Sequence, residues 1–189
     1  TSISLPVLEM DETLKALDMR MGAAFDLDAE GQDLLLIAHR NLTEDFPYHN
    51  SARPFRNSPL ELTVAAGEPL IWPAGEFPDA LIRPWLAKSG VAQVITIPLV
   101  AKGKLVGVFN LGTDSMRAFT PEERTLMAAI GQQIGVAVEN AHLYQKAEET
   151  ATLAERTRLA RELHDSVTQS LYSVTLFAEA AASQLAAGN

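Results

Sequence analysis

The sequence contains no cysteine among its 189 residues. Disulfide bonds and thiolate metal sites are therefore excluded, and the chain gives no indication of its redox compartment. Long apolar runs are also absent. The longest, residues 91–101, is interrupted by Gln93 and Thr96 and falls well short of the roughly 20 residues that span a bilayer. A secretory signal is missing too, so we expect no membrane segment in this stretch of chain.

Basic residues are outnumbered, because 15 Lys and Arg against 24 Asp and Glu leave a formal net charge of -9. Such a chain repels phosphate backbones and anionic membrane surfaces, so nucleic acid is not expected as a partner. Hydrophobic residues make up 47% of the sequence, which is enough for a packed core. The length suits one domain of ordinary size followed by a helical extension.

Five stretches in the first two thirds of the chain are predicted to form strands. The clearest two, residues 92–100 and 104–112, are rich in β-branched residues and are joined through Lys102 and Gly103, which is typical of a hairpin. The others are residues 19–26, 33–40 and 69–72. Residues 34–37 read Leu-Leu-Leu-Ile, so we expect that strand to lie at the centre of a sheet, covered on both faces.

Short helices are expected between these strands. They span residues 5–17, 58–66 and 77–88. The third should bend or end near Pro84 and stop at Gly90. Residues 41–57 show no periodicity and are expected to form a loop. This order of elements predicts an α+β fold, in which a mainly antiparallel sheet is flanked by helices.

A long helix is predicted to follow the last strand. Thr120, with Pro121 next and Glu123 three residues on, forms a capping box that opens a helix. No proline follows Pro121, and no glycine interrupts the pattern between Gly135 and Gly188. We therefore expect one helix to run through most of the remaining sequence.

One stretch of this helix, residues 155–171, reads ERTRLARELHDSVTQSL and combines an apolar stripe with a polar cluster. The stripe recurs mainly every third or fourth residue, at Leu159, Leu163, Val167, Leu171, Val174, Ala178, Ala181 and Leu185. His164 lies beside it, and its helical neighbours Arg161 and Thr168 are polar. Its imidazole should therefore reach water, where a ring nitrogen can act as a nucleophile.

Residues 155–171 resemble the phosphoacceptor box of two-component sensor histidine kinases, in the subfamily that reads E-R-x-R-[IL]-A-R-E-L-H-D-x-V-x-Q-x-L. The resemblance implies that His164 accepts the γ-phosphoryl group of ATP. It implies that Asp165 acts as general base or orients the imidazole, and that Gln169 positions water when the enzyme works in reverse as a phosphatase. These roles come from the resemblance, not from the spacing.

The same resemblance implies a set of partners. The helix would form a homodimer with its twin, receive phosphate from the ATP-binding domain of the same kinase with ATP and Mg²⁺, and pass it to a response regulator. That ATP-binding domain is not in the sequence, which has neither its glycine-rich phosphate loop nor its asparagine-bearing helix. Since the chain opens on Thr1 rather than methionine, we expect it to be a piece of a longer protein.

A second resemblance covers roughly residues 14–140. Ile97-Pro98-Leu99, followed by Gly103 and residues 105–108, resembles the central hairpin of GAF sensor domains, whose fold is similar to that of PAS domains. The predicted organisation is a GAF sensor domain at residues 1–140, a signalling-helix linker at 141–158 and the first helix of a dimerisation and histidine phosphotransfer domain at 159–189. The resemblance implies a cytoplasmic location and leaves membrane attachment of the full-length protein open.

GAF domains can hold small ligands in mostly apolar pockets with a few polar groups. The candidate ligand-binding residues are Trp72, Phe55, Trp85, Tyr48, His49, Arg53 and Arg56. The alternative is that the aromatic residues are core or lid packing and the arginines are exposed. Covalent bilin attachment and methionine-sulfoxide reduction both need cysteine and are excluded. The N-K-x-x-F-x-x-x-D-E pattern of cyclic-nucleotide-binding GAF domains is absent.

Haem is not expected, and no metal site is predicted. Haem-binding GAF domains of gas-sensing kinases place the ligating histidine just before the Ile-Pro-Leu strand, and residues 83–91 contain none. Only His39 or His49 could substitute, and a lone histidine in such positions is more often simply hydrogen-bonded. No cofactor is therefore predicted for this part of the protein.

Signal relay is predicted to run along the long helix. Its first part carries apolar positions suited to pairing with a twin helix, at Leu126, Ile130, Ile134, Ala137, Ala141 and Tyr144. Residues 145–158 form a weaker, out-of-phase segment, whose packing could shift between two states and change the exposure of His164. The alternative is a ligand-binding or purely dimerising GAF module without a phosphotransfer role.

Overall fold

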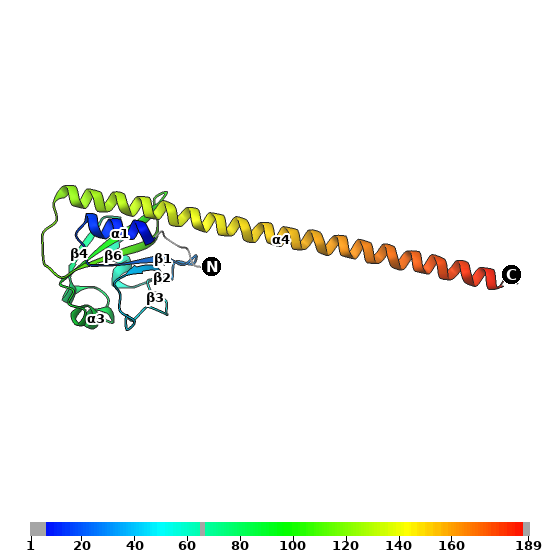
Figure 1. Ribbon diagram of the computed structural model, residues 1–189, viewed down its shortest axis with the longest axis horizontal. Helices are drawn as coiled ribbons and strands as arrows, with labels where there is room; N and C mark the ends of the chain where they lie inside the picture. The colour runs from blue at the N-terminus through cyan, green and yellow to red at the C-terminus, as the bar shows by residue number, and fades with distance from the viewer. Residues whose placement is uncertain (1–6, 65–66, 187–189) are drawn as a thin grey trace. The chain divides into compact units, whose positions relative to one another are not determined.

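The computed structural model describes residues 7–64 and 67–186, and the chain divides into two compact units, residues 1–142 and 143–189. Within the described ranges, six strands form one sheet in the order β3-β2-β1-β6-β5-β4 (Figure 1). Their bounds are β1 Met21–Leu27, β2 Asp33–Arg40, β3 Arg53–Pro54, β4 Leu70–Pro73, β5 Gln93–Ala101 and β6 Lys104–Thr113. Every neighbouring pair is antiparallel, which confirms the predicted sheet.

The β5–β6 hairpin forms where the sequence predicts it. Lys102 and Gly103 connect the two strands with φ angles of 50° and 75°. Positive φ at both turn residues is the geometry of a type I′ turn, whose twist matches that of the flanking strands. The turn therefore fixes the register of the longest strand pair in the sheet.

The position of β2 differs from the prediction. It lies second from the edge of the sheet, next to the two-residue strand β3, and not at the centre. Leu34 is fully buried, whereas Leu35 is 44% exposed, so only one face of this strand is well covered there. The central pair is β1 and β6, and the first six residues of β1 are all buried. A run of four apolar residues thus belongs to a half-exposed strand.

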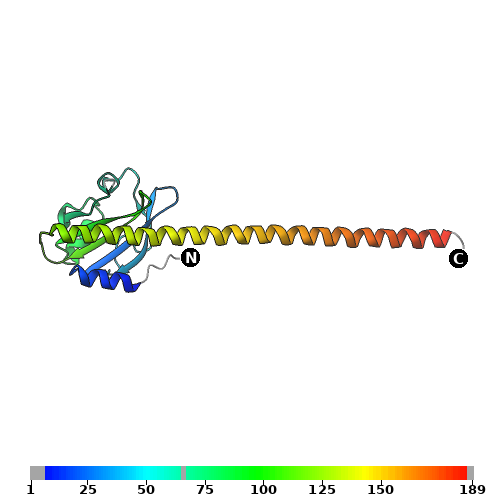
Figure 2. The same cartoon turned by 90° about the horizontal axis from the view of Figure 1, so that it is seen from above.

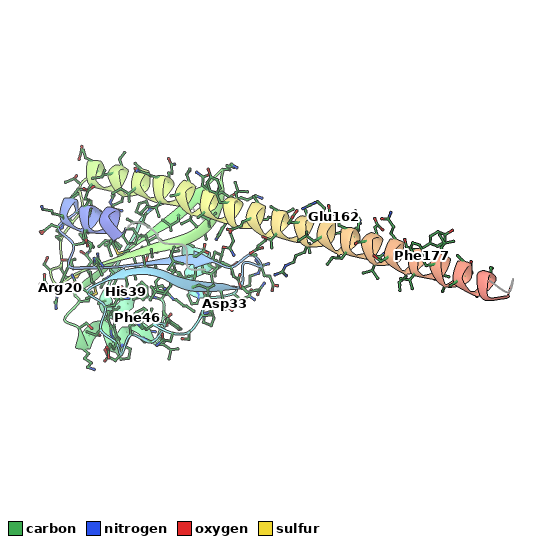
Figure 3. All side chains as sticks on the ribbon, turned by 45° about the vertical axis from the view of Figure 1, so that its right-hand side comes forward. Arg20, Asp33, His39, Phe46, Glu162 and Phe177 are labelled. Carbon is green, nitrogen blue, oxygen red and sulfur yellow. The ribbon has the colours of Figure 1, made fainter. Side chains whose placement is uncertain are left out.

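Helices cover both faces of the sheet. On one face lie α1 (Val7–Ala16) and the first part of α4 (Pro121–Ala186), which Figure 2 shows from above. On the other face lie α2 (Pro59–Val64), the short 3-10 helix η1 (Ala74–Glu76) and α3 (Ile82–Lys88). Phe46, from the loop after β2, also lies on this second face (Figure 3). Of the predicted helices, residues 5, 6, 65 and 66 lie outside the described residues.

Helix α3 is shorter than predicted, because it begins at Ile82 and not at residue 77. Pro84 does not bend it. The proline occupies the first turn, where its missing N–H has no helical acceptor to lose. Before the helix, the Asp79 carboxylate accepts a hydrogen bond from the Leu81 N–H at 2.9 Å, which holds residues 79–81 in a turn. Gly90, with a φ of 68°, ends the helix as predicted.

The capping box opens α4 as predicted. Glu123 accepts a hydrogen bond from the Thr120 N–H at 2.8 Å, and the Thr120 hydroxyl accepts one from the Glu123 N–H at 3.2 Å. The helix then continues for 66 residues without a break. Among the described residues, no helix combines the length and the apolar character needed to cross a membrane.

Within the first unit, α4 packs directly on the backbone of β5. A Cβ atom added at Gly131 would lie 2.5 Å from the Pro98 carbonyl oxygen, and one added at Gly135 would lie 2.6 Å from both the nitrogen and the oxygen of Val100. No side chain fits at these distances. The two glycines, one turn apart, therefore set how closely the helix approaches the sheet.

The predicted pairing face of α4 is partly wrong. Ile134 is buried in the core between α4 and the sheet, and Ile130 packs partly against the same core. Neither is free to face a twin helix. Leu126, Ala137 and Tyr144 are exposed, so only part of the predicted seam is available for dimerisation.

Candidate functional site

His164 lies on α4 in the second unit, and 80% of its side chain is exposed. Asp165 is equally open, and its Oδ1 lies 3.7 Å from the Nδ1 atom of His164, which is too long for a hydrogen bond. Gln169 is exposed on the same helix, one turn beyond Asp165. The imidazole is therefore accessible on both ring nitrogens, with a carboxylate on its Nδ1 side. The roles of these three residues stay predictions.

An apolar stripe runs beside His164. Its large members are between 45% and 66% exposed: Leu159, Leu163, Val167, Leu171 and Val174. The side chain of Leu185, at the predicted end of the stripe, lies outside the described residues. An exposed apolar row of this length is what a second helix covers in a coiled coil. Figure 3 shows Phe177 beyond these residues on the same helix.

Ion pairs between side chains one turn apart stabilise this part of the helix without help from tertiary contacts. Arg158 contacts Glu155 at 2.7 Å, three residues before it, and also pairs with Glu162, four residues after it. Such pairs support a helix that has little tertiary packing. The hydrogen bonds from Arg158 lower the pKa of the Glu155 carboxyl, so this pairing is ionic near neutral pH.

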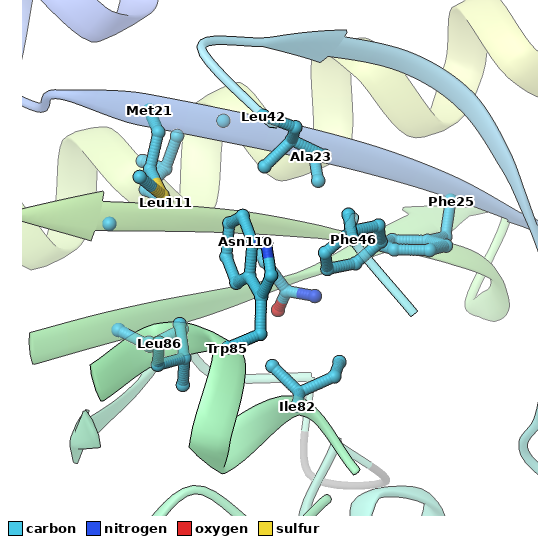
Figure 4. Close-up of a pocket in the computed structure, with 13 residues that line it drawn as sticks. Met21, Ala23, Phe25, Leu42, Phe46, Ile82, Trp85, Leu86, Asn110 and Leu111 are labelled. Atoms are coloured by element: carbon cyan, nitrogen blue, oxygen red, sulfur yellow. The ribbon is translucent and has the colours of Figure 1, made fainter. Parts of the chain in front are cut away.

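A second candidate site is a cavity of about 30 Å³ inside the first unit, between the sheet and α3 (Figure 4). Small residues of the sheet, Ala23 and Gly112, leave the space open, and Trp85 covers it. The lining residues are Met21, Gly22, Ala23, Phe25, Leu42, Phe46, Ile82, Trp85, Leu86, Val94, Asn110, Leu111 and Gly112. Asn110 is the polar side chain among them, and its carbonyl oxygen accepts a hydrogen bond from the Thr96 hydroxyl at 2.8 Å.

The loop after β2 is tied to α3 above this cavity. The Trp85 indole N–H donates to the Thr43 hydroxyl oxygen at 3.0 Å, and the Thr43 hydroxyl donates to Asp45 at 2.6 Å. Asp45 in turn forms an ion pair with Lys88 of α3. The Phe46 ring meets the Trp85 ring edge to face, with centroids 4.9 Å apart. These contacts form a lid whose polar groups lie on the solvent side.

The ion pair of Asp45 in this lid should make the stability of the domain depend on pH. Hydrogen bonds from Lys88 and Thr43 lower the pKa of Asp45 from 3.8 to about 2. Because the pKa of Asp45 is lower in the folded state, the ionised carboxylate stabilises the fold at pH values above 3.8, its ordinary pKa. This contribution is lost as the pH falls from 3.8 towards about 2. We therefore expect Asp45→Asn to show a smaller loss of stability between about pH 5 and about pH 2.5 than the wild type, measured as urea midpoints.

Glu44→Gln is the matched control for this prediction, because Glu44 is the exposed acidic neighbour of Asp45. It removes the same charge and leaves the Lys88 contact in place. If both variants keep the wild-type dependence on pH, the ion pair does not contribute to acid stability.

The candidate ligand-binding residues are scattered. Trp85 lines the cavity, and its role in binding stays a prediction. Phe55 and Tyr48 are buried elsewhere in the same core, and Trp72 is half-buried on β4. The others are not in the lining either: the His49 ring lies 5.0 Å from that of His39, and Arg56 is exposed, 3.9 Å from Glu61. Sequence reasoning missed Ala23, Asn110 and the other sheet residues, because no motif marks which face of a strand borders a void.

Arg53 is the exception to the expectation that the arginines are exposed, because only 1% of it is accessible. Its Nε donates to Asp79 at 2.8 Å, and its guanidinium carbon lies 5.4 to 5.9 Å from the centroids of the rings of Phe25, Tyr48 and Phe77. Burial lowers the pKa of Arg53, and Asp79 opposes that shift. The rings enclose the cation, so Arg53 is a brace between β3 and the segment before α3.

Comparison with known proteins agrees with this architecture. A family model described as GAF domain matches residues 10–139, so the chain belongs to the GAF domain family. A second model, described as Histidine kinase, matches residues 155–189, the segment that contains His164. The predicted combination of a GAF domain with a histidine kinase segment is therefore confirmed. The predicted boundaries between the segments stay predictions.

Individual relatives point the same way. The chain is 39% identical over 93 residues to the sensor histidine kinase YhcY of Bacillus subtilis (strain 168), which is 49% of this chain and 24% of that protein. The chain thus spans about a quarter of the length of this relative.

Solved structures support the fold. The GAF domain of a two-component sensor histidine kinase from Bacillus halodurans has a TM-score of 0.62 at 19% identity, covering 76% of this chain and 99% of that one. The GAF domain of an Acinetobacter phosphoenolpyruvate-protein phosphotransferase has a TM-score of 0.59 at 15% identity, covering 77% and 89%. At these identities the likeness shows the fold alone.

Proposed function

We propose that this chain is the sensory and phosphoacceptor portion of a two-component histidine kinase, in which His164 takes the γ-phosphoryl group of ATP and passes it to an aspartate of a response regulator. The observation that carries the proposal is the accessible imidazole of His164 within the segment that the Histidine kinase model matches. The proposed use of ATP implies a cytoplasmic location for this segment.

We propose separate roles for the two ring nitrogens. Asp165 lies on the Nδ1 side, where a small rotamer change would let its carboxylate accept the Nδ1 proton and orient the ring. Nε2 would then be the nucleophile. Its lone pair forms the N–P bond while the bond between the γ-phosphorus and the bridging oxygen breaks, and ADP leaves. In the reverse, phosphatase direction, Gln169 would position the attacking water.

Dimerisation follows from the apolar stripe beside His164. The stripe is exposed in the single chain, and a twin helix would cover it and leave open the side of His164 that faces Arg161 and Thr168, which are polar. The further partners of this proposal are the ATP-binding domain of the same kinase, which would supply ATP and Mg²⁺, and the response regulator. Transfer of label from ATP by a separately supplied ATP-binding domain, with and without His164, tests the proposal.

For the sensor domain we propose a small, mainly apolar ligand held in the cavity under Trp85. The cavity volume of about 30 Å³ is small, so the ligand would have only a few non-hydrogen atoms. Asn110 would supply the polar contact. Haem is not proposed, because a macrocycle would need a far larger space.

Xenon is a suitable probe, since it enters apolar cavities without needing polar partners. We expect saturable chemical-shift changes at amides of β1 and β6 under xenon pressure, and their loss in Ala23→Val, whose added methyl groups fill the cavity. Ala38→Val is the matched control, because Ala38 packs in the core on the other face of the sheet. Absence of xenon shifts in both the wild type and Ala38→Val would favour the alternative, a GAF domain that dimerises without a ligand.

A further inference from the structure

The sheet-facing side of α4 ends on a histidine. Met127, Ile134 and Val138 are buried on this side of the helix, and His142 is the next position along the same stripe. The Nε2 atom of His142 lies 2.7 Å from Oδ2 of Asp26, on β1. Residues 143–183 are exposed, so within the described residues this hydrogen bond is the last contact of the stripe.

The buried carboxylate of Asp26 has His142 as its side-chain hydrogen-bond partner. Its carboxylate is 10% exposed, and among the described residues its Oδ1 atom is buried without a hydrogen-bond partner. Burial raises the pKa of Asp26, and the hydrogen bond from His142 opposes the shift. The residues paired with Asp26 across the sheet, Leu35 and Gly107, carry no charge. A buried carboxylate with so few alternatives depends strongly on the partner it has.

The same strand borders the cavity on its other face. Ala23 and Phe25 line the cavity, and Asp26, the next residue, points to α4 because successive side chains of a strand alternate. The pairing of β1 with β2 shifts register between Ala24 and Phe25, so the strand is irregular at this point. A displacement of Phe25 by an occupant of the cavity would therefore move Asp26 as well.

Upstream of His142, α4 is held by contacts of a different kind. Gly131 and Gly135 seat the helix on the backbone of β5 with no space for adjustment. Packing of this type is rigid, because small changes in distance bring atoms into overlap. The polar contact at His142 is thus the place where the helix can separate from the sheet without disturbing the core.

We propose that the Asp26–His142 hydrogen bond is a clasp between the strand that borders the cavity and the helix that leads to His164, closed in the empty domain and loosened when an occupant displaces β1. The clasp rests on the proposed sensory function and gives it a mechanism: the end of α4 in the first unit is fixed while the clasp is closed and frays when it opens.

Hydrogen exchange of the intact chain tests the clasp directly. We expect the amides of residues 140–146 to exchange about 10-fold faster in Asp26→Asn and in His142→Gln than in the wild type, which corresponds to about 1.4 kcal/mol. Glu139→Gln is the matched control, since it removes a charge from the same turn of helix without touching the hydrogen bond. Unchanged exchange in both clasp variants would overturn the proposal. If Asp26→Asn unfolds the sheet, the exchange rates of His142→Gln alone test the proposal. His142 is 36% exposed and outside the core, so its replacement should leave the domain folded.

Coupling to the cavity needs a double-mutant cycle. Ala23→Val serves as a fixed occupant of the cavity, and we expect it to speed exchange at residues 140–146 in the wild-type background but not in His142→Gln, where the clasp is already open. Equal effects in both backgrounds would show that the signal bypasses the clasp. Because this measurement uses neither ATP nor His164, its failure would leave the proposed phosphotransfer intact.

Discussion

His164→Gln is expected to abolish phosphorylation of this chain when it is incubated with radiolabelled ATP and the matching ATP-binding domain. Glutamine keeps the length and the hydrogen-bonding ability of the side chain but has no ring nitrogen with a lone pair that can attack phosphorus. The wild type should take up label that is stable in alkali and lost in acid, as expected of an N–P bond. The loss of acid-labile label should be complete, because His164 is the single histidine of residues 143–189.

His39→Gln is the matched control, since His39 lies on β2 in the first unit. It does not line the cavity and is not part of the phosphoacceptor segment. It should label like the wild type. Equal labelling of His164→Gln and the wild type would reject phosphotransfer at this residue. The chain would then be better described as a ligand-binding or purely dimerising GAF module.

Gly135→Val is expected to lower the free energy of unfolding of the GAF domain by about 3 kcal/mol. The new Cβ would lie 2.6 Å from the backbone nitrogen and oxygen of Val100, and backbone atoms held by the pairing of β5 with β6 cannot move aside as a flexible side chain can. The helix would have to lift from β5, which would also expose Ile134 and Val138. The gain in helix propensity on replacing glycine is under 1 kcal/mol and is too small to compensate.

Urea unfolding followed by tryptophan fluorescence measures this effect, since both tryptophans of the chain, Trp72 and Trp85, report on the GAF domain. Gln132→Val is the control, because residue 132 is exposed on the same helix and accepts the same side chain without contact. It should change stability by no more than about 0.5 kcal/mol. Equal stabilities of the two variants would mean that α4 does not approach β5 as closely as described.

Local chemistry explains what could be predicted from the sequence. The β5–β6 hairpin depends on two adjacent residues that both adopt positive φ, and the start of α4 depends on a reciprocal pair of hydrogen bonds between Thr120 and Glu123. The phosphoacceptor segment is a contiguous motif on one helix, so His164 and its polar neighbours could be identified without knowing the rest of the fold. In each case the interacting groups lie within a few residues of one another.

The cavity and the clasp could not be found in the same way. Asp26 and His142 are 116 residues apart in sequence, and nothing in either neighbourhood indicates the other. Arg53 looked like a surface residue because its acceptor, Asp79, and its three aromatic neighbours come from three separate segments. The lining of the cavity likewise combines β1, β5, β6, α3 and a loop.

By itself, the sequence determined the kinds of elements, their order, the long helix and the exposed histidine, because hydrophobic periodicity, turn residues and caps act over a few residues. Only the tertiary structure decided that β1 and not β2 is central, that Ile134 faces the sheet and not a twin helix, and that a carboxylate of β1 meets the last sheet-facing residue of α4. Those outcomes depend on which apolar faces are buried against each other, and that choice is made by packing across the whole domain.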